Sequence, residues 1–356
     1  MRKRSRRAFL AGVGATGVGG LAGCLGFELE SSSLEPSLVE NRPDAVYVPT
    51  HTEGMAMGEM GSDGGYSCAL TYSYPHRFWT VTGSDTTQVE VGSDDALHLM
   101  PVVWHSETGV IPSDVSPRVD VTRDGESVVD GLNPWPMLAQ QMGYHFGDNI
   151  EIPEAGEYTV TVSVGAGGDR RTGPLADTAA AEFEFTLDYQ PSELRDLPFE
   201  DIAEARQGTL GAAEPMQMDM VPTMQAPTAD DLPGTVRGTT ESGDAQFVVT
   251  TLDDATRFGG KEGQQYVAVS PRTPYNRFPL PQMSLSATLS RDGETRFDGY
   301  LNEWLDPDLG IHYGAVVEGV AVDDELTIAV DSPPQISRHE GYETAFLGMP
   351  DTTLTL

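Results

Sequence analysis

Cysteine and lysine are scarce in this chain of 356 residues. The two cysteines, Cys24 and Cys68, are too few for a disulfide framework. Lysine occurs only at Lys3 and Lys261, so arginine supplies nearly all the positive charge. A nucleophile motif, a His-x-x-x-His zinc pair and a glycine-rich phosphate loop are also lacking. A blue-copper enzyme would need a ligand cysteine, and Cys68 lies in an apolar segment far along the chain from the candidate histidines. We therefore expect no enzyme.

Positive charge of any kind is limited, because 21 Lys and Arg face 55 Asp and Glu, for a net charge of −34. Nucleic acids bind to basic surfaces, so a nucleic-acid partner is excluded. The acidic residues are spread along the whole chain. Such a surface is typical of proteins that work in concentrated salt, where screening over about 3 Å removes most of the self-repulsion. An ordinary acidic secreted protein is the alternative.

Residues 1–24 have the pattern of a targeting segment. A basic start runs into Ser5-Arg6-Arg7-Ala8-Phe9-Leu10, which matches a twin-arginine export signal. A Gly- and Ala-rich run, too short for a spanning helix, then ends at Leu21-Ala22-Gly23-Cys24, a lipobox-like sequence. We predict a lipid on Cys24 that anchors the protein to the cell membrane, on the extracellular face of the cytoplasmic membrane. Residues 25–42 would form a polar tether.

From residue 97 onward the segments are short and rich in β-branched residues, with turns at Asp124-Gly125, Asp130-Gly131 and Ala155-Gly156. Regular strand spacing without a long stretch of 3.6-residue period predicts an all-β sandwich or barrel. We expect one sandwich over residues 43–190 and a second over residues 241–356. An acidic, Met- and Pro-rich linker over residues 191–240 would join them.

The second half of the chain echoes the first. Arg123-Asp124-Gly125-Glu126 recurs as Arg291-Asp292-Gly293-Glu294, and Tyr144-His145-Phe146-Gly147 matches Ile311-His312-Tyr313-Gly314. This pattern predicts a duplication. The spacing that places His98 before the first turn places Tyr266 before the second. The second copy thus keeps the scaffold without most of the candidate ligands, and we expect it to serve packing or partner binding.

Histidine and methionine also recur near predicted turns. The stretch from His51 to Met60 holds one histidine, three methionines and two glutamates. Thioether-rich loops can bind soft copper(I), and they can equally be mobile surface. His76, directly after Pro75, fits a structural histidine better than a ligand. Four methionines of the linker fit a domain connector better than a loop beside the metal; they are Met216, Met218, Met220 and Met224.

Four segments of the first half carry a family pattern: Leu97-His98-Leu99-Met100 with the following residues to His105, Pro136-Met137 to His145-Phe146-Gly147, Gly156 to Thr161, and Phe183-Glu184-Phe185. In this respect residues 44–190 resemble the periplasmic ferrous-iron transport protein family. Its motifs are an H-L-E-A-D-I-H strand start, an M-P-M-V-A-S-D-G-P-H-Y-G loop, a G-x-Y-x-x-T strand and a terminal E-F-x-F strand. The family consists of small, often lipid-anchored immunoglobulin-like β-sandwiches that dimerise and bind copper or another divalent metal.

The resemblance implies two immunoglobulin-like sandwiches in tandem, the second a degenerate repeat. It implies the metal ligands His98, Met137 and His145, and as cofactor copper or another first-row divalent metal such as iron or manganese. Two positions depart from the family, because Met100 replaces a motif glutamate and Arg171 takes the place of a third histidine. His51, Met55 or His105 would then complete the site, and the sulfur of Met100 would shift it toward Cu(I).

The function implied is that of an exported, membrane-anchored, non-catalytic protein that binds copper or ferrous iron during iron or copper uptake. Its partners would be an iron permease and a second copy of the chain in a homodimer. The alternative is a non-catalytic envelope interaction module whose metal site has been lost.

Overall fold

The computed structural model of the protein describes residues 37–218 and 220–356. The predicted leader with Cys24, and the part of the tether before residue 37, lie outside the described residues. Within the described ranges the chain is built almost wholly of strands, with one short α-helix, α1 (Pro191–Arg195), and 3-10 turns at Gly173–Asp177 and Thr256–Phe258. The prediction of an all-β fold is confirmed.

The first half forms two sheets that face each other. The larger sheet has the strand order β2-β3-β6-β10-β9-β21-β4-β5. Its strands are β2 (Ala56–Asp63), β3 (Tyr66–Ser73), β4 (Phe78–Thr82), β5 (Asp85–Val89), β6 (Asp95–His105), β9 (Trp135–Ala139), β10 (Gly143–Glu151) and β21 (Ser337–Arg338). The smaller sheet has the order β12-β11-β7-β8, with β7 (Arg118–Arg123), β8 (Glu126–Leu132), β11 (Gly156–Val164) and β12 (Ala181–Tyr189).

The alternation of buried and exposed residues along the strands explains how the two sheets pack. In β12 every second residue from Ala181 to Tyr189 is buried and the residues between them are exposed. One face of this strand therefore contacts the core and the other faces solvent. The central strand β6 is buried at nine of its eleven residues, as a strand covered on both faces should be. This full burial is what places His98 inside the protein.

The second half forms one continuous sheet of order β14-β15-β16-β19-β18-β17-β20-β22. Its strands are β14 (Thr235–Ser242), β15 (Ala245–Leu252), β16 (Gln265–Arg272), β17 (Ser284–Arg291), β18 (Glu294–Asp306), β19 (Gly310–Val317), β20 (Glu325–Ser332) and β22 (Thr352–Thr355). The two edge strands approach each other, since the hydroxyl of Thr240 bonds that of Thr352 and Ser242 Oγ donates to the carbonyl of Pro350 at 2.6 Å. The sheet thus curls back on itself.

The strand orders of the two halves correspond. The series β2-β3-β6-β10-β9 has the same connections as β14-β15-β16-β19-β18. The repeated Asp-Gly pairs occupy equivalent hairpin turns, with Asp124 and Asp292 at φ of 52° and 54°. Positive φ is tolerated best by Gly, Asn and Asp, which explains why the pair recurs. Origin by duplication stays a prediction.

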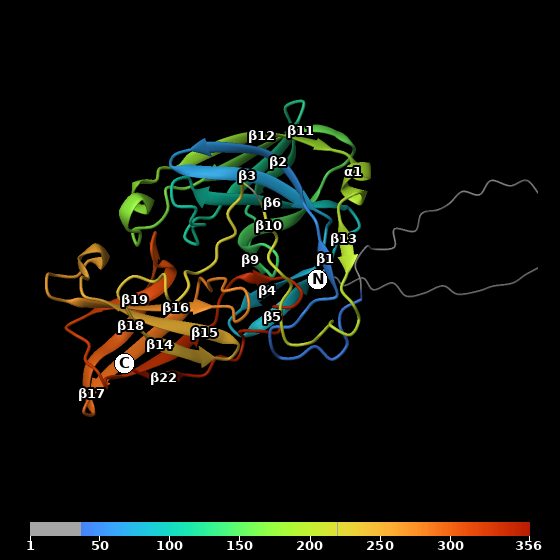
Figure 1. Ribbon diagram of the computed structural model, residues 1–356. Coiled ribbons are helices and arrows are strands. Elements are labelled where there is room, and N and C mark those ends of the chain that lie inside the picture. The colour runs from blue at the N-terminus through green and yellow to red at the C-terminus, as the bar shows by residue number, and fades with distance from the viewer. Residues whose placement is uncertain (1–36, 219) are drawn as a thin grey trace, which may run out of the picture. The chain divides into compact units, whose positions relative to one another are not determined.

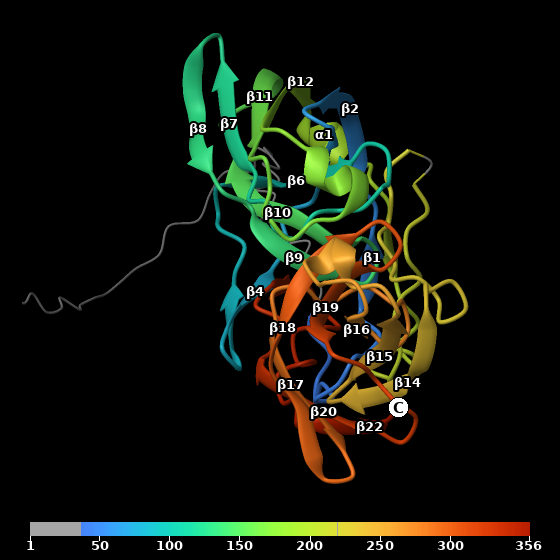
Figure 2. The same cartoon turned by 90° about the vertical axis from the view of Figure 1, so that its left-hand side faces the viewer.

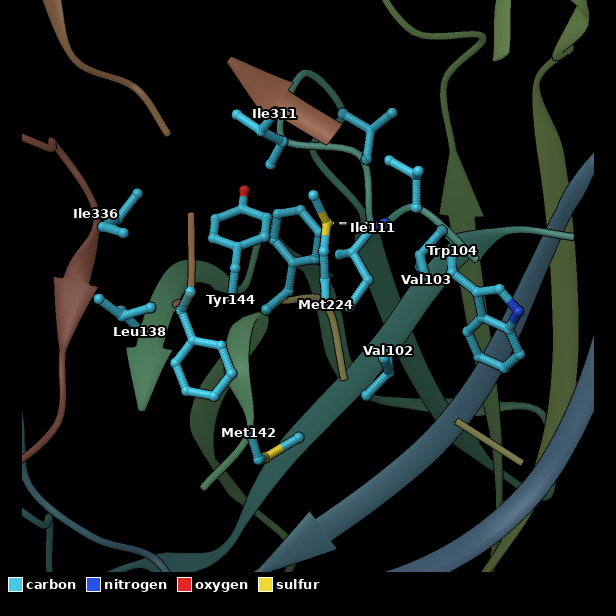
Figure 3. Close-up of a cluster of buried hydrophobic side chains, with 14 of the residues drawn as sticks. Val102, Val103, Trp104, Ile111, Leu138, Met142, Tyr144, Met224, Ile311 and Ile336 are labelled. Carbon is cyan, nitrogen blue, oxygen red and sulfur yellow. Dashed lines mark hydrogen bonds between the residues drawn. The ribbon is translucent and has the colours of Figure 1, made fainter. Parts of the chain in front are cut away.

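The two halves are joined more closely than two sandwiches in tandem would be. The short strand β21, from near the end of the chain, pairs in parallel with β9 and antiparallel with β4 inside the first sheet. Figures 1 and 2 show β9 of the first half next to the orange and red second half. Side chains from both halves also share one hydrophobic core, in which Leu138 and Tyr144 lie near Ile311 and Ile336 (Figure 3).

The predicted linker is also structured. In residues 191–240, β13 (Phe199–Asp201) pairs with β1 (His51–Glu53), and β14 begins at Thr235 rather than after residue 240. Cys68 is a free, buried thiol on β3. Among the described residues no helix is long and apolar enough to cross a membrane.

Candidate metal centre

Three neighbouring strands place the sequence-predicted donors close together. His98 lies on β6, opposite Asn149 of β10. His145 lies further back on β10, opposite Met137 of β9. Because β6, β10 and β9 are consecutive in the sheet, residues that are far apart in the sequence become neighbours.

Two further histidines enter the same region from outside these strands. His76 lies in the connection between β3 and β4, and His339 directly follows β21. One ring nitrogen of each of His76, His98 and His339 lies within 4.8 Å of the others. The ring of His145 lies 5.3 Å from that of His339, centroid to centroid. We call His76, His98, His145, His339 and Met137 the donor cluster.

Hydrogen bonds fix the two strand histidines in one tautomer. Nδ1 of His98 lies 2.8 Å from Oδ1 of Asn149, and Nδ1 of His145 lies 3.0 Å from the carbonyl of Gly143. Both oxygens can only accept, so each Nδ1 carries the proton and each Nε2 keeps its lone pair. Both Nε2 atoms are buried without a hydrogen-bond partner. A second bond that fixes the ring and leaves one bare nitrogen is the arrangement found around metal-binding histidines.

Burial keeps these imidazoles neutral. His98 is 0% exposed and His145 is 1% exposed. Burial lowers the pKa of His145 to about 4. Burial, reinforced by the nearby His76, also holds the pKa of His98 and of His339 well below its usual range. A neutral imidazole is the form that coordinates a metal ion.

A thioether and an amide complete the surroundings of the donor cluster. Sδ of Met137 lies 3.3 Å from Nε2 of His339. The Asn149 amide that fixes His98 also donates to the carbonyl of His76 at 2.9 Å and accepts from its backbone N–H at 3.3 Å. One side chain thus positions two members of the donor cluster.

A more exposed group of residues borders the donor cluster. Oε1 of Glu53 lies 2.9 Å from Nε2 of His51, and Oε2 lies 3.2 Å from Nδ1 of His76. The side chains of His51, Glu53 and His76 are 13%, 17% and 14% exposed, so they lie at the boundary with solvent. We call these three residues the outer triad.

The structure places the other sequence-predicted residues differently. Met100 follows His98 on β6 but packs in the hydrophobic core. His105 lies at the far end of β6, seven residues and about 23 Å from His98, where its Nδ1 contacts the Thr108 hydroxyl. Arg171 pairs with Asp114 at 2.5 Å and donates to Tyr66 Oη at 2.7 Å. It lies at the His105 end of the sheet, away from the donor cluster.

Sequence reasoning assigned His76 to a structural role and did not single out His339, Glu53 or Asn149. Five of the seven histidines gather in the donor cluster and the outer triad, and His105 and His312 lie elsewhere. The histidine after Arg338 carries no local signal, because its position depends on a strand pairing between distant parts of the chain.

The equivalent place in the second half is closed. His312 repeats the His145 arrangement, with Nδ1 at 3.1 Å from the carbonyl of Gly310. Its Nε2, however, lies 3.1 Å from the hydroxyl of Tyr266, the residue that the repeat aligns with His98. The Nε2 lone pair has no partner in His145, whereas in His312 it accepts a hydrogen bond from the Tyr266 hydroxyl.

Comparisons with known proteins match parts of the chain. Residues 230–355 match a family model described as a domain of unknown function (DUF7350). No curated protein matches the chain.

Solved structures similar to part of the chain include FetP from uropathogenic Escherichia coli strain F11, with 16% identity, a TM-score of 0.28, and coverage of 39% of this chain and 95% of FetP. A copper-bound variant of the same FetP has 16% identity, a TM-score of 0.29, and coverage of 39% and 92%. A copper-bound variant of the P19 protein from Campylobacter jejuni has 14% identity, a TM-score of 0.28, and coverage of 39% and 97%. A partial likeness at this level leaves the function to be argued from the side chains themselves.

Proposed function

We propose that this protein is a non-catalytic metal-binding protein whose donor cluster holds one copper ion or another first-row divalent ion. The observation that carries the proposal is the pair of bare, buried Nε2 atoms on His98 and His145. A buried polar atom without a partner costs roughly 1–3 kcal/mol, and a bound metal ion removes that cost. The ring of His339 lies 5.8 Å from that of His98 and 5.3 Å from that of His145, and its Nε2 contacts Sδ of Met137, so further donors lie next to both rings.

The donor types favour copper. Imidazole nitrogens suit copper and other late first-row metals, and the thioether of Met137 favours its softer state, Cu(I). Manganese(II) is better served by carboxylate oxygens, whereas the donor cluster has only nitrogen and sulfur donors and Glu53 contacts His76 from outside it. When bound, copper would be held by residues that the fold has already fixed and desolvated.

The cellular role follows from the sequence. The leader and Cys24 support export and lipid anchoring at the extracellular face of the cytoplasmic membrane. A tethered protein with one buried copper or iron site fits metal uptake, in which it would deliver ions to a permease, alone or as a homodimer. The acidic surface supports work in concentrated salt.

Metal analysis of the full chain, purified in detergent, tests the binding function. We expect one tightly held copper per chain, and no tightly held copper in the double variant His98→Ala/His145→Ala. The variant His105→Ala is the control, because it removes a histidine from the other end of β6. If the double variant keeps its tightly held copper, the donor cluster is not the site. If the unaltered chain takes up no copper or other first-row ion, the protein is an interaction module.

A further inference from the structure

The donor cluster is enclosed, so an ion must reach it past other residues. His98, His145 and Met137 are 0%, 1% and 0% exposed. The outer triad is partly exposed and touches the donor cluster through His76, whose ring lies 4.1 Å from that of His98 and 4.7 Å from that of His339. His76 therefore belongs to both groups.

The outer triad combines residue types that bind metal ions. Two imidazoles approach opposite oxygens of one carboxylate, and such a set of two histidines and one carboxylate is well suited to a first-row divalent ion. A divalent cation would neutralise the Glu53 carboxylate, whose side chain is only 17% exposed.

The backbone holds these ligands in place. His51 and Glu53 are two residues apart on β1, so both side chains point to the same side of the strand. The ring of His51 stacks on Phe199 at 4.8 Å, and the backbone N–H of Glu53 donates to Oε1 of Gln141 at 3.1 Å. The carboxylate is thus presented to His76 by a paired strand rather than by a free loop.

We propose that His51, Glu53 and His76 form a second, shallower metal site that captures a divalent ion and passes it through His76 to the donor cluster. This inference rests on the proposed function, since it needs a buried site to load. The harder oxygen and nitrogen donors lie outside, and the nitrogen and sulfur donors lie inside. A hydrated divalent ion therefore binds first to the outer oxygen and nitrogen ligands, which suit it. It then exchanges them stepwise for the buried nitrogen and sulfur ligands.

Stopped-flow loading of the metal-free full chain with copper(II) tests the outer site. In Glu53→Gln and in His51→Ala we expect loading at least ~10-fold slower than in the unaltered chain. Each variant loses a ligand that captures the ion, and Glu53→Gln also loses the negative electrostatic potential that attracts it. Both variants should still bind one copper per chain at equilibrium. The control is Glu200→Gln, which removes one negative charge from an exposed residue of β13, the strand paired with β1.

A second measurement isolates the outer site. The double variant His98→Ala/His145→Ala should lose tight copper but keep one weak copper(II) ion, and Glu53→Gln added to it should abolish that ion. The inference is overturned if Glu53→Gln and His51→Ala load as fast as Glu200→Gln. It is also overturned if either variant loses the tightly held copper, because Glu53 or His51 would then serve the buried site. A normal copper content with unchanged loading would leave the proposed function standing and remove only the outer site.

Discussion

Nε2 of His339 lies 3.3 Å from Sδ of Met137, although 202 residues separate them in the chain. The contact exists because β21 is inserted in parallel beside β9, with Ser337 opposite Met137. The donor cluster is therefore not a property of the first sandwich alone. Any metal ion that it holds would be coordinated by both halves of the chain, and binding should strengthen their association.

Replacement of His339 tests this dependence on the C-terminal segment. We expect His339→Ala to weaken copper binding at least about tenfold, since it removes one donor and leaves Met137 without its neighbour. A competition titration with a copper chelator measures the change. The control His105→Ala should bind as the unaltered chain does. Equal affinity in both variants would show that the first sandwich binds its ion unaided.

A second prediction concerns Tyr266 and His312 in the second half, where we expect stability to change and copper binding to stay the same. Tyr266→Phe removes only a hydroxyl, and it leaves Nε2 of the buried His312 without a partner. We expect the free energy of unfolding to fall by about 1–3 kcal/mol while the copper content stays the same. Tyr300→Phe is the matched control, because Tyr300 is 71% exposed and should tolerate the change. Chemical denaturation and metal analysis measure the two quantities, and loss of copper in Tyr266→Phe would mean that the surroundings of His312 contribute to the copper site.

The sequence predicted the parts of the site that lie on regular strands. Short β-branched segments separated by regularly spaced turns were sufficient for the all-β class, which the structure confirms. The placement of His98, Met137 and His145 in one region follows from three consecutive strands, and the family pattern contained those strands. Whether these three bind metal stays a prediction.

Residues positioned by long-range pairing could not be predicted in the same way. His339 reaches the donor cluster only because a two-residue strand joins a sheet formed by the other end of the chain. No periodicity is visible in two residues. His76 follows Pro75 in an irregular connection, where sequence does not specify the direction of a side chain. Arg171 could not be excluded from the site until its ion pair with Asp114 was located at the other end of β6.

The low pKa of the buried histidines predicts how the metal-free protein responds to acid. The pKa of His145 is about 4 in the folded state, against about 6.5 in an unfolded chain. Above pH ~6.5 the group is neutral in both states, and as the pH falls from there toward 4 only the unfolded state takes up the proton. Stability should therefore decrease through this window, by on the order of 3 kcal/mol for His145 alone.

Guanidinium unfolding of the metal-free protein at a series of pH values measures this decrease. The variant His145→Gln should show a shallower dependence, because it lacks the titrating group. Protons also compete weakly with copper while the folded pKa stays near 4, so bound copper should remain through dialysis at about pH 5.5. Release of copper between pH 6 and 7 would mean that the coordinating histidines are not these buried ones.

A single methyl group at Gly147 tests whether Nε2 of His98 is a coordinating atom. Gly147 lies on β10 opposite Trp135, and its missing side chain leaves the space that the His98 ring occupies. A Cβ at this position would collide with Nε2 itself. In Gly147→Ala the imidazole must turn away, and we expect copper affinity to fall at least about tenfold, with about 1–3 kcal/mol of stability lost to overpacking.

Two glycines supply controls for this change. Gly165→Ala adds a methyl group that would meet nothing within 4 Å, so neither copper binding nor stability should change. Gly314→Ala crowds the hydroxyl of Tyr266 in the second half, so it should lower stability without affecting copper. Chelator competition and chemical denaturation of all three variants separate crowding from coordination. Full copper affinity in Gly147→Ala would remove His98 from the set of ligands, because the added carbon and a metal ion on Nε2 would require the same space.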